Sequence, residues 1–207
     1  MDFARPVQAV IPGAQGRILA VLAETTAELN LRMIARLAGV STAQASRLLP
    51  SLVQLGVLER REAPPSQLFR FVQENVAARA ISALTNARRT VLDELGQAAG
   101  DLEPPPACVI VFGSFARGEA DAESDLDLIV VRPSGTDEDD ERWRESVNRL
   151  RLRAQRLTGN RVEIVETDAT KVRGLLRGRT PLWLDVRREG IVVFGTGLAD
   201  LAGRRSA

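Results

Sequence analysis

Two aspartates, Asp125 and Asp127, lie two residues apart where an apolar run over 126–131 begins. Side chains two apart on a strand project from the same face, so both carboxylates would face the same space. Adjacent hard anions are costly unless a cation neutralises them, and hard oxygen ligands favour Mg²⁺. Paired metal ions suit phosphoryl or nucleotidyl displacement. The pair therefore indicates metal-dependent chemistry on a phosphate.

A Gly113-Ser114 motif lies earlier in the chain, at the end of another apolar run over 107–112. Glycine lets the backbone turn sharply and approach a phosphate closely. Ser114, at the start of a short predicted helix, adds a hydroxyl beside free backbone amides, which is a natural phosphate cradle. Either motif alone is commonly a simple turn or a solvated loop. Together, between two apolar strands, they predict a site for a phosphate group beside a metal ion.

Gly113-Ser114-Phe115-Ala116-Arg117-Gly118, followed by Ser124-Asp125-Leu126-Asp127-Leu128, resembles the signature of the DNA polymerase β-like nucleotidyltransferase superfamily. The match is especially close to its minimal nucleotidyltransferase branch, which includes antitoxin-type enzymes and relatives of kanamycin nucleotidyltransferase. The resemblance covers about residues 104–197, and its specific part is 113–131.

This resemblance implies an enzyme that transfers a nucleoside monophosphate, AMP from ATP in the first instance, to a hydroxyl group with release of pyrophosphate. It implies that Asp125 and Asp127 hold two Mg²⁺ ions that also grip the triphosphate. It further implies that Gly113 and Ser114 bind the β- and γ-phosphates, and that Arg117 neutralises phosphate charge.

The family requires a third carboxylate on a later strand. The pattern predicts a helix over 138–157 and then a strand over 161–166, in which Glu163 is flanked by apolar residues. The resemblance makes Glu163 the third metal-ligating and catalytic acid, which assists deprotonation of the acceptor. Aspartate is commoner at this position, so the longer arm of Glu163 is a departure from the family pattern. Glu166, nearer the strand end, is the alternative.

Residues 104–106 are three consecutive prolines. The spacing of apolar residues in the chain before them predicts mainly helices. Helices are predicted over 14–27 and 31–38, followed by a turn at Gly39-Val40. A capping box from Ser41 to Gln44 opens the next helix, which Gly56 ends. Two strand-like runs, 57–62 and 67–71, flank a proline turn and predict a hairpin. This order is that of a winged helix-turn-helix and resembles bacterial regulators of the MarR/ArsR type over about residues 14–72.

The second resemblance implies that the capped helix, about 42–55, enters the major groove of double-stranded DNA. The side chains it would offer to the bases are Thr42, Gln44 and Arg47. The hairpin would contact backbone phosphates through Arg60, Arg61 and Arg70. Solvated hairpin charge is the simpler interpretation of these arginines, and neighbouring glutamates dilute the patch. DNA affinity should therefore be modest unless the protein forms a homodimer.

The pattern predicts an α/β two-domain protein, with an N-terminal winged helix-turn-helix domain and a C-terminal α/β nucleotidyltransferase fold with a mixed sheet. The expected boundaries are 1–73 for the DNA-binding domain, 74–106 for a connecting helix and Pro-rich linker, 107–197 for the nucleotidyltransferase domain and 198–207 for a flexible tail. Apolar residues over 74–99 follow near-heptad spacing. That helix is either a connector packed on its own domain or a dimerisation helix.

Composition excludes several other kinds of site. The 207 residues include no histidine, which rules out Ser-His-Asp triads, Cys-His dyads and His-ligated metals. One cysteine, Cys108, excludes an internal disulfide and a multi-cysteine zinc site. Tyrosine is absent, so a tyrosine acceptor must lie on another chain. Because no long apolar run and no signal-peptide core occur, we expect a cytoplasmic protein without membrane association.

Four functions fit these motifs. The first is a DNA-binding transcription regulator fused to an active nucleotidyltransferase. The second is a regulator whose nucleotidyltransferase half only senses nucleotide. The third is a toxin–antitoxin component that modifies a partner protein or a tRNA. The fourth, an antibiotic-modifying enzyme, is disfavoured because a winged helix is an unusual companion for it and no drug-binding domain is evident.

Overall fold

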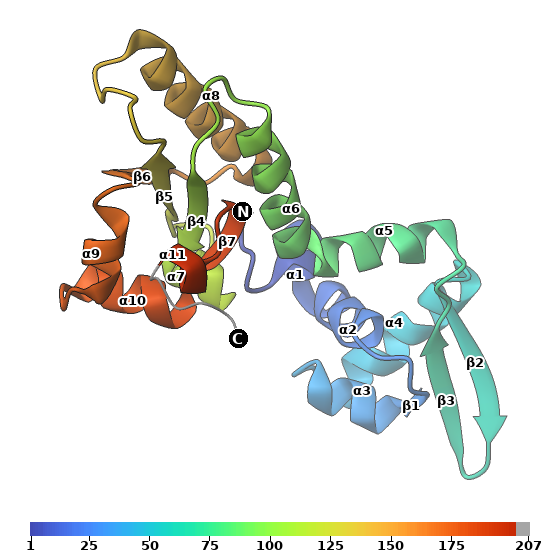
Figure 1. Ribbon diagram of the computed structural model, residues 1–207. Helices are drawn as coiled ribbons and strands as arrows, with labels where there is room; N and C mark the ends of the chain where they lie inside the picture. Colours follow the sequence, from blue (N-terminus) through green and yellow to red (C-terminus); the bar gives the residue numbers. More distant parts are fainter. Residues whose placement is uncertain (202–207) are drawn as a thin grey trace. The chain divides into compact units, whose positions relative to one another are not determined.

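The computed structural model describes residues 1–201, and its internal contacts divide the chain into two compact units (Figure 1). One unit is Arg5–Ala87, and the other combines Met1–Ala4 with the chain from Arg88 onward. The division falls within the span 74–106 that we expected to connect the domains. None of the helices within residues 1–201 has the length and apolar character needed to span a bilayer.

The unit Arg5–Ala87 combines a group of helices with a small antiparallel sheet. Its helices are α1 (Pro6–Val10), α2 (Gly13–Ala23), α3 (Leu31–Leu37), α4 (Thr42–Gln54) and α5 (Val76–Thr85). Its strands are β1 (Leu29–Asn30), β2 (Leu58–Ala63) and β3 (Ser66–Phe71), in the order β1-β3-β2. The helix-turn-helix followed by a β2–β3 hairpin confirms the predicted architecture, while α1 was not predicted.

A single apolar core holds this unit together. Ile18 of α2, Ile34 of α3 and Leu49 of α4 are completely buried in it. Phe69 from the hairpin and Ile81 from α5 pack into the same core. The helix α5 is therefore part of this unit, although the sequence assigned its residues to a connector.

The predicted capping box is present at the start of α4. The Ser41 hydroxyl accepts a hydrogen bond from the Gln44 amide (3.1 Å), and the Gln44 side-chain oxygen accepts one from the Ser41 amide (2.9 Å). We expect Ser41→Ala to lower the free energy of unfolding of this unit by about 1 kcal/mol, because the Gln44 amide loses its acceptor. Urea denaturation followed by circular dichroism measures this. Ser46→Ala, on an exposed site of the same helix, should leave the midpoint unchanged; equal midpoints for both variants would contradict the prediction.

The prediction of a single helix over 74–99 is wrong. The structure has two helices there, α5 and α6 (Ala87–Gly100), and Asn86 lies between them. The Asn86 side-chain amide donates to the Ser82 carbonyl (2.9 Å), and such local bonds compete with a continuous helix. The apolar residues of α6, Val91 and Leu95, are buried within this chain, as the connector alternative requires.

The second unit is built on a four-stranded mixed sheet, which confirms the predicted fold class. Its strands are β4 (Cys108–Phe112), β5 (Leu126–Arg132), β6 (Val162–Asp168) and β7 (Ile191–Gly195), in the order β6-β5-β4-β7. The β5–β6 pair is parallel, and the other pairs are antiparallel. The helices are α6, α7 (Gly113–Arg117), α8 (Glu141–Thr158), α9 (Val172–Arg177), α10 (Pro181–Glu189) and α11 (Leu198–Leu201). Of the expected flexible tail, 198–201 is helical and 202–207 lies outside the described residues.

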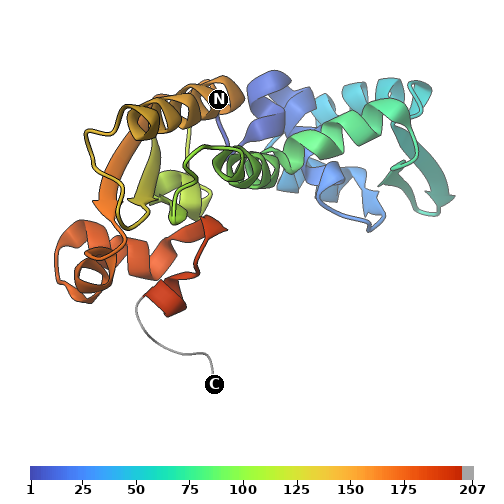
Figure 2. The same ribbon diagram turned by 45° about the horizontal axis from the view of Figure 1, so that its top comes forward.

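The sheet lies between two helical layers (Figure 2). On one face, Ile110 and Ile129 pack against Leu176 of α9 and Trp183 of α10. The opposite face is covered by α8, as the view in Figure 2 shows. Because side chains alternate along a strand, Asp127 shares the α9–α10 face with Ile129. The candidate site therefore lies on that face, where β5 begins.

Candidate active site

The Gly113-Ser114 motif turns the chain from β4 into α7. Gly113 has φ +71°, a left-handed conformation that glycine adopts without strain. The residue before it, Phe112, is paired with Asp127 across the β4–β5 ladder, so the turn lies directly beside that aspartate. A Cβ atom on residue 113 would collide with the Asp127 carboxylate. Glycine is therefore required here both by the backbone conformation and by the neighbouring acid.

The predicted carboxylates come from two adjacent strands. Asp127 and Glu163 are register partners in the parallel β5–β6 pair, so their side chains project from the same face. Asp125 lies two residues before Asp127. Burial raises the pKa of Asp127, and the negative charges of Asp125 and Glu163 raise it further, whereas Arg117 acts in the opposite direction. The three acids thus act on one another electrostatically.

The alternative third acid, Glu166, is placed elsewhere. It pairs with Val130, three residues along β5 from Asp127, which corresponds to about 10 Å. Its side chain projects from the opposite face of β6 and accepts a hydrogen bond from the Trp143 indole nitrogen (2.7 Å). The register therefore favours Glu163 over Glu166 as the partner of Asp127.

Sequence reasoning missed Arg161, the cation among these acids. Its Nε donates to Glu163 Oε1 (2.7 Å), its Nη2 donates to the same oxygen, and its Nε lies 3.7 Å from Asp125 Oδ1. The Glu163 hydrogen bond, with the charges of both acids, raises the pKa of Arg161. The signal in the sequence was its position two residues before Glu163, which places both side chains on one face of an extended chain.

The donor chemistry of the acids fits a hard divalent cation. All three are carboxylates, and the raised pKa of Asp127 reflects excess negative charge that a cation would relieve. Within residues 1–201, however, no three acidic, cysteine or histidine side chains converge as ligands of a single ion. Glu163 is hydrogen-bonded to Arg161 instead. Asp125 and Asp127 would hold Mg²⁺, and Glu163 would join them on release from Arg161.

We expect Arg161→Gln to raise the affinity of the nucleotide-free protein for Mn²⁺ by about two- to five-fold. An exposed ion pair is worth up to about 1 kcal/mol, and metal binding no longer competes with it. Electron paramagnetic resonance titration of free Mn²⁺ measures this directly. Arg151→Gln removes an equal charge from an exposed position on α8 and serves as the control. Unchanged Mn²⁺ affinity in Arg161→Gln would contradict the competition.

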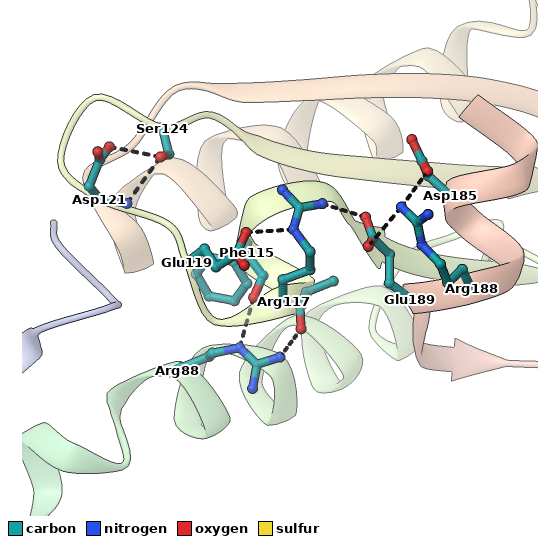
Figure 3. Close-up of polar contacts among 10 residues, drawn as sticks. Arg88, Phe115, Arg117, Glu119, Asp121, Ser124, Asp185, Arg188 and Glu189 are labelled. Atoms are coloured by element: carbon teal, nitrogen blue, oxygen red, sulfur yellow. Dashed lines mark hydrogen bonds and ion pairs between the residues drawn. The ribbon is translucent and has the colours of Figure 1, made fainter. Parts of the chain in front are cut away.

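Arg117, predicted to neutralise phosphate charge, is engaged in two ion pairs. Its Nε donates to Glu119 (2.6 Å) and its Nη1 to Glu189 at the end of α10 (2.5 Å) (Figure 3). The structure thus places Arg117 as an ion-pair partner that fastens α7 to α10. Ser114 lies half-buried in the first turn of α7.

A second residue that sequence reasoning missed, Arg88 of α6, also holds α7 in place. Its guanidinium donates to the carbonyl oxygens of Phe115 (2.7 Å) and Ala116 (Figure 3). Both carbonyls lie in the last turn of α7, where that of Phe115 also accepts a hydrogen bond from the Gly118 amide (3.1 Å). Because the acceptors belong to the main chain, no side-chain motif in the sequence could have indicated this contact.

The predicted DNA-contacting residues all lie in the unit Arg5–Ala87. Thr42 and Arg47 are exposed on the first turns of α4. The side-chain oxygen of Gln44 accepts the hydrogen bond from the Ser41 amide in the capping box. Each hairpin arginine is paired with an acid: Arg60 with Glu62 (3.6 Å), Arg70 with Glu59 (2.8 Å), and Arg61 with Glu28. The hairpin arginines therefore bring little net positive charge.

Comparison with protein families identifies both units. Residues 92–177 match the model of the nucleotidyltransferase domain, and residues 16–62 match that of the IclR helix-turn-helix domain. The expected MarR/ArsR type is therefore corrected to the IclR type. Our prediction rested on the order of helices and hairpin, and that order alone did not determine the subtype. The nucleotidyltransferase match begins within α6, before the expected start at 107.

Several solved structures are similar to part of this chain. One assigned as a minimal nucleotidyltransferase is 34% identical, with 53% of this chain and 91% of that chain covered and a TM-score of 0.31. A toxin–antitoxin with AMP-PNP is 21% identical, with 55% and 80% covered and a TM-score of 0.38. NadR in complex with 4-hydroxyphenylacetate is 19% identical, with 44% and 69% covered and a TM-score of 0.35. No curated protein matches this chain.

Proposed function

We propose that this chain, which carries a nucleotidyltransferase domain behind an IclR-type helix-turn-helix domain, is a DNA-binding transcription regulator that also transfers a nucleoside monophosphate. ATP is the donor, a hydroxyl group is the acceptor and pyrophosphate is the leaving group. The observation that carries the proposal is the pairing of Asp127 with Glu163 on one face of the sheet, directly beside the turn at Gly113.

Each part of the site has a task in this reaction. The backbone at Gly113 and the hydroxyl of Ser114 bind the β- and γ-phosphates. Asp125 and Asp127 hold Mg²⁺, which supplies charge neutralisation at the phosphates when bound. Glu163 takes the proton from the acceptor hydroxyl as its oxygen attacks the α-phosphate in line. Arg117, which is held by Glu119 and Glu189, would neutralise phosphate charge on release from one of these ion pairs.

A second candidate function is a nucleotide-sensing regulator without transfer activity. The observation that favours it is the hydrogen bonding of Glu163 to Arg161, which occupies the group that would accept the proton. In that case the cytoplasmic protein would bind nucleotide, and the bound state would alter its DNA affinity through different affinities of two conformations.

Transfer of label separates these candidates. The purified full chain is incubated with each α-³²P-labelled nucleoside triphosphate, Mg²⁺ and cell lysate, beside the double variant Asp125→Asn/Asp127→Asn. Label transferred by wild type alone supports the nucleotidyltransferase. Mg²⁺-dependent nucleotide binding without transfer supports the sensor, and absence of both contradicts the proposal for this half.

The chemistry of the labelled product then identifies the acceptor. Loss of label on RNase treatment indicates a tRNA or another RNA, and loss on protease treatment indicates a partner protein, as in a toxin–antitoxin pair. Because the chain contains no tyrosine, label on tyrosine must lie on another protein.

A further inference from the structure

The helix-turn-helix unit has an open groove between α3 and the hairpin turn. It has a volume of about 620 Å³ and is lined by residues of the first turns of α3, including Arg32 and Arg36, and by Pro65–Gln67. In Figure 1, α3 follows β1, and β1 is paired with β3, which brings the start of α3 next to the hairpin. The groove lies wholly within the unit Arg5–Ala87.

The groove is positively charged. Arg32 and Arg36 are four residues apart, so their side chains lie on one face of α3. No acidic side chain lines the groove, and within the described chain neither arginine is paired with a carboxylate. Arg36 donates a hydrogen bond from Nη2 to the Met33 sulfur (2.8 Å), which is a weak acceptor. Most guanidinium donors in the groove thus remain available to a ligand.

The hairpin offers a contrast within the same unit. Each of its arginines forms an ion pair with a glutamate. A phosphate that binds to one of these arginines must displace the carboxylate, so the net attraction between arginine and phosphate is small. An unpaired arginine binds a phosphate without this competition, and its planar fork matches two phosphate oxygens. Phosphate contacts are therefore expected at the groove rather than along the hairpin strands.

The position of the groove relative to α4 fits duplex DNA. The helix α4 follows α3 after a short turn. In helix-turn-helix proteins the second helix enters the major groove and the first helix crosses the DNA backbone, so α3 lies on the side of the phosphates when α4 reads the bases. Neutral donors at the hairpin turn, such as Ser66, add to the lining.

We propose that Arg32 and Arg36, with the hairpin turn at Pro65–Gln67, form the site that binds the backbone phosphates of duplex DNA. The inference rests on the proposed DNA-binding function and names the residues that carry its sequence-independent part. These contacts fix the position of the protein on the duplex, and α4 reads the bases.

The salt dependence of DNA binding tests this site without knowledge of the operator. The full chain is titrated into a fluorescent 30-base-pair duplex of mixed sequence at several salt concentrations. Each phosphate contact contributes about 0.9 to the slope of log K against log[salt]. Arg32→Gln and Arg36→Gln should each reduce the slope by about 0.9. The double variant should reduce it by about 1.8 and weaken binding at 0.1 M salt by roughly 10- to 60-fold.

Two controls isolate the groove from general charge. Arg79→Gln removes one exposed positive charge from α5 of the same unit, and the double variant Arg89→Gln/Asp93→Asn removes an exposed ion pair of α6. Both should leave the slope within about 0.3 of wild type. Circular dichroism should show unchanged folding for all variants, since Arg32 and Arg36 are exposed.

The outcomes distinguish this inference from the proposed function. A wild-type chain that binds the duplex, with an unchanged slope in the Arg32→Gln/Arg36→Gln variant, overturns the inference alone. A wild-type chain without salt-dependent binding overturns both. A double variant that loses binding of fluorescent ATP while its DNA slope is retained assigns the groove to free nucleotide phosphates and also overturns the inference.

Discussion

Asp127→Asn is expected to lower nucleotidyl transfer by about 10³-fold while it raises the thermal stability of the protein. The loss of activity follows because a carboxylate that holds Mg²⁺ against the phosphates supplies several kcal/mol of transition-state stabilisation, and about 4 kcal/mol corresponds to 10³ in rate. The gain in stability follows because the Asp127 carboxylate is partly buried beside two other negative charges, which raise its pKa. Single-turnover transfer and thermal denaturation measure the two effects.

The stability gain should depend on pH in a defined direction. The ordinary pKa of this group is 3.8, and folding raises it. The folded state therefore binds the proton more tightly than the unfolded chain, and stability falls as pH rises from 3.8 through the raised pKa. Above the raised pKa, the destabilisation of the fold by the ionised Asp127 carboxylate is fully present. The difference in Tm between Asp127→Asn and wild type should thus be largest near pH 7 and shrink as pH falls through the raised pKa towards 3.8.

Asp121→Asn provides a control with the opposite sign. Its carboxylate accepts hydrogen bonds from the Ser124 hydroxyl (2.7 Å) and the Glu123 amide (3.0 Å), which lower its pKa. The ionised Asp121 carboxylate stabilises the folded protein above pH 3.8, and this stabilisation is lost as pH falls through the lowered pKa. This variant should lose stability at pH 7 and keep its transfer activity. A fall in the Tm of Asp127→Asn at pH 7 would show that the three acids do not repel one another as inferred.

The order of elements and the main acids could be predicted from the sequence because they depend on local patterns. Apolar runs bounded by glycine, proline and capping residues predicted β4, β5 and the capped helix α4. The spacing of Asp125 and Asp127, and the place of Glu163 in the next strand, follow from period-two alternation. The parallel register then brought Asp127 and Glu163 together, as the family resemblance implied.

The contacts that sequence reasoning missed depend on where long side chains settle after folding. Arg88 donates hydrogen bonds to main-chain carbonyls that are distant in the sequence. Arg161 is hydrogen-bonded to Glu163 and forms an ion pair with Asp125, although the chain contains many other acidic residues. An arginine side chain reaches many acceptors, and the sequence alone does not rank them. The break at Asn86 has a similar cause, because one side-chain bond to Ser82 competes with a helical pattern that continues on both sides.

Gly113→Ala is expected to abolish most transfer activity and to lower the free energy of unfolding by about 1–2 kcal/mol. This loss of stability comes from the left-handed conformation at φ +71°, which a Cβ atom disfavours. The collision of that Cβ with the Asp127 carboxylate adds little to this stability loss, because the end of a side chain can move away. Moving Asp127 relieves the collision only by misplacing the metal ligand. Urea denaturation and the transfer assay measure both consequences.

Gly118→Ala separates the backbone cost from the collision. Gly118 has φ +76°, close to that of Gly113, but a Cβ there meets nothing closer than Arg88 Nε at 3.8 Å. This variant should lose about 1–2 kcal/mol of stability through the backbone alone and retain most of its transfer activity. The difference in transfer activity between the two variants then reports the contact between residue 113 and Asp127. If Gly118→Ala reduced transfer as severely as Gly113→Ala, a general weakening of α7 would explain both, and the close approach of Gly113 to Asp127 would not be what the reaction requires.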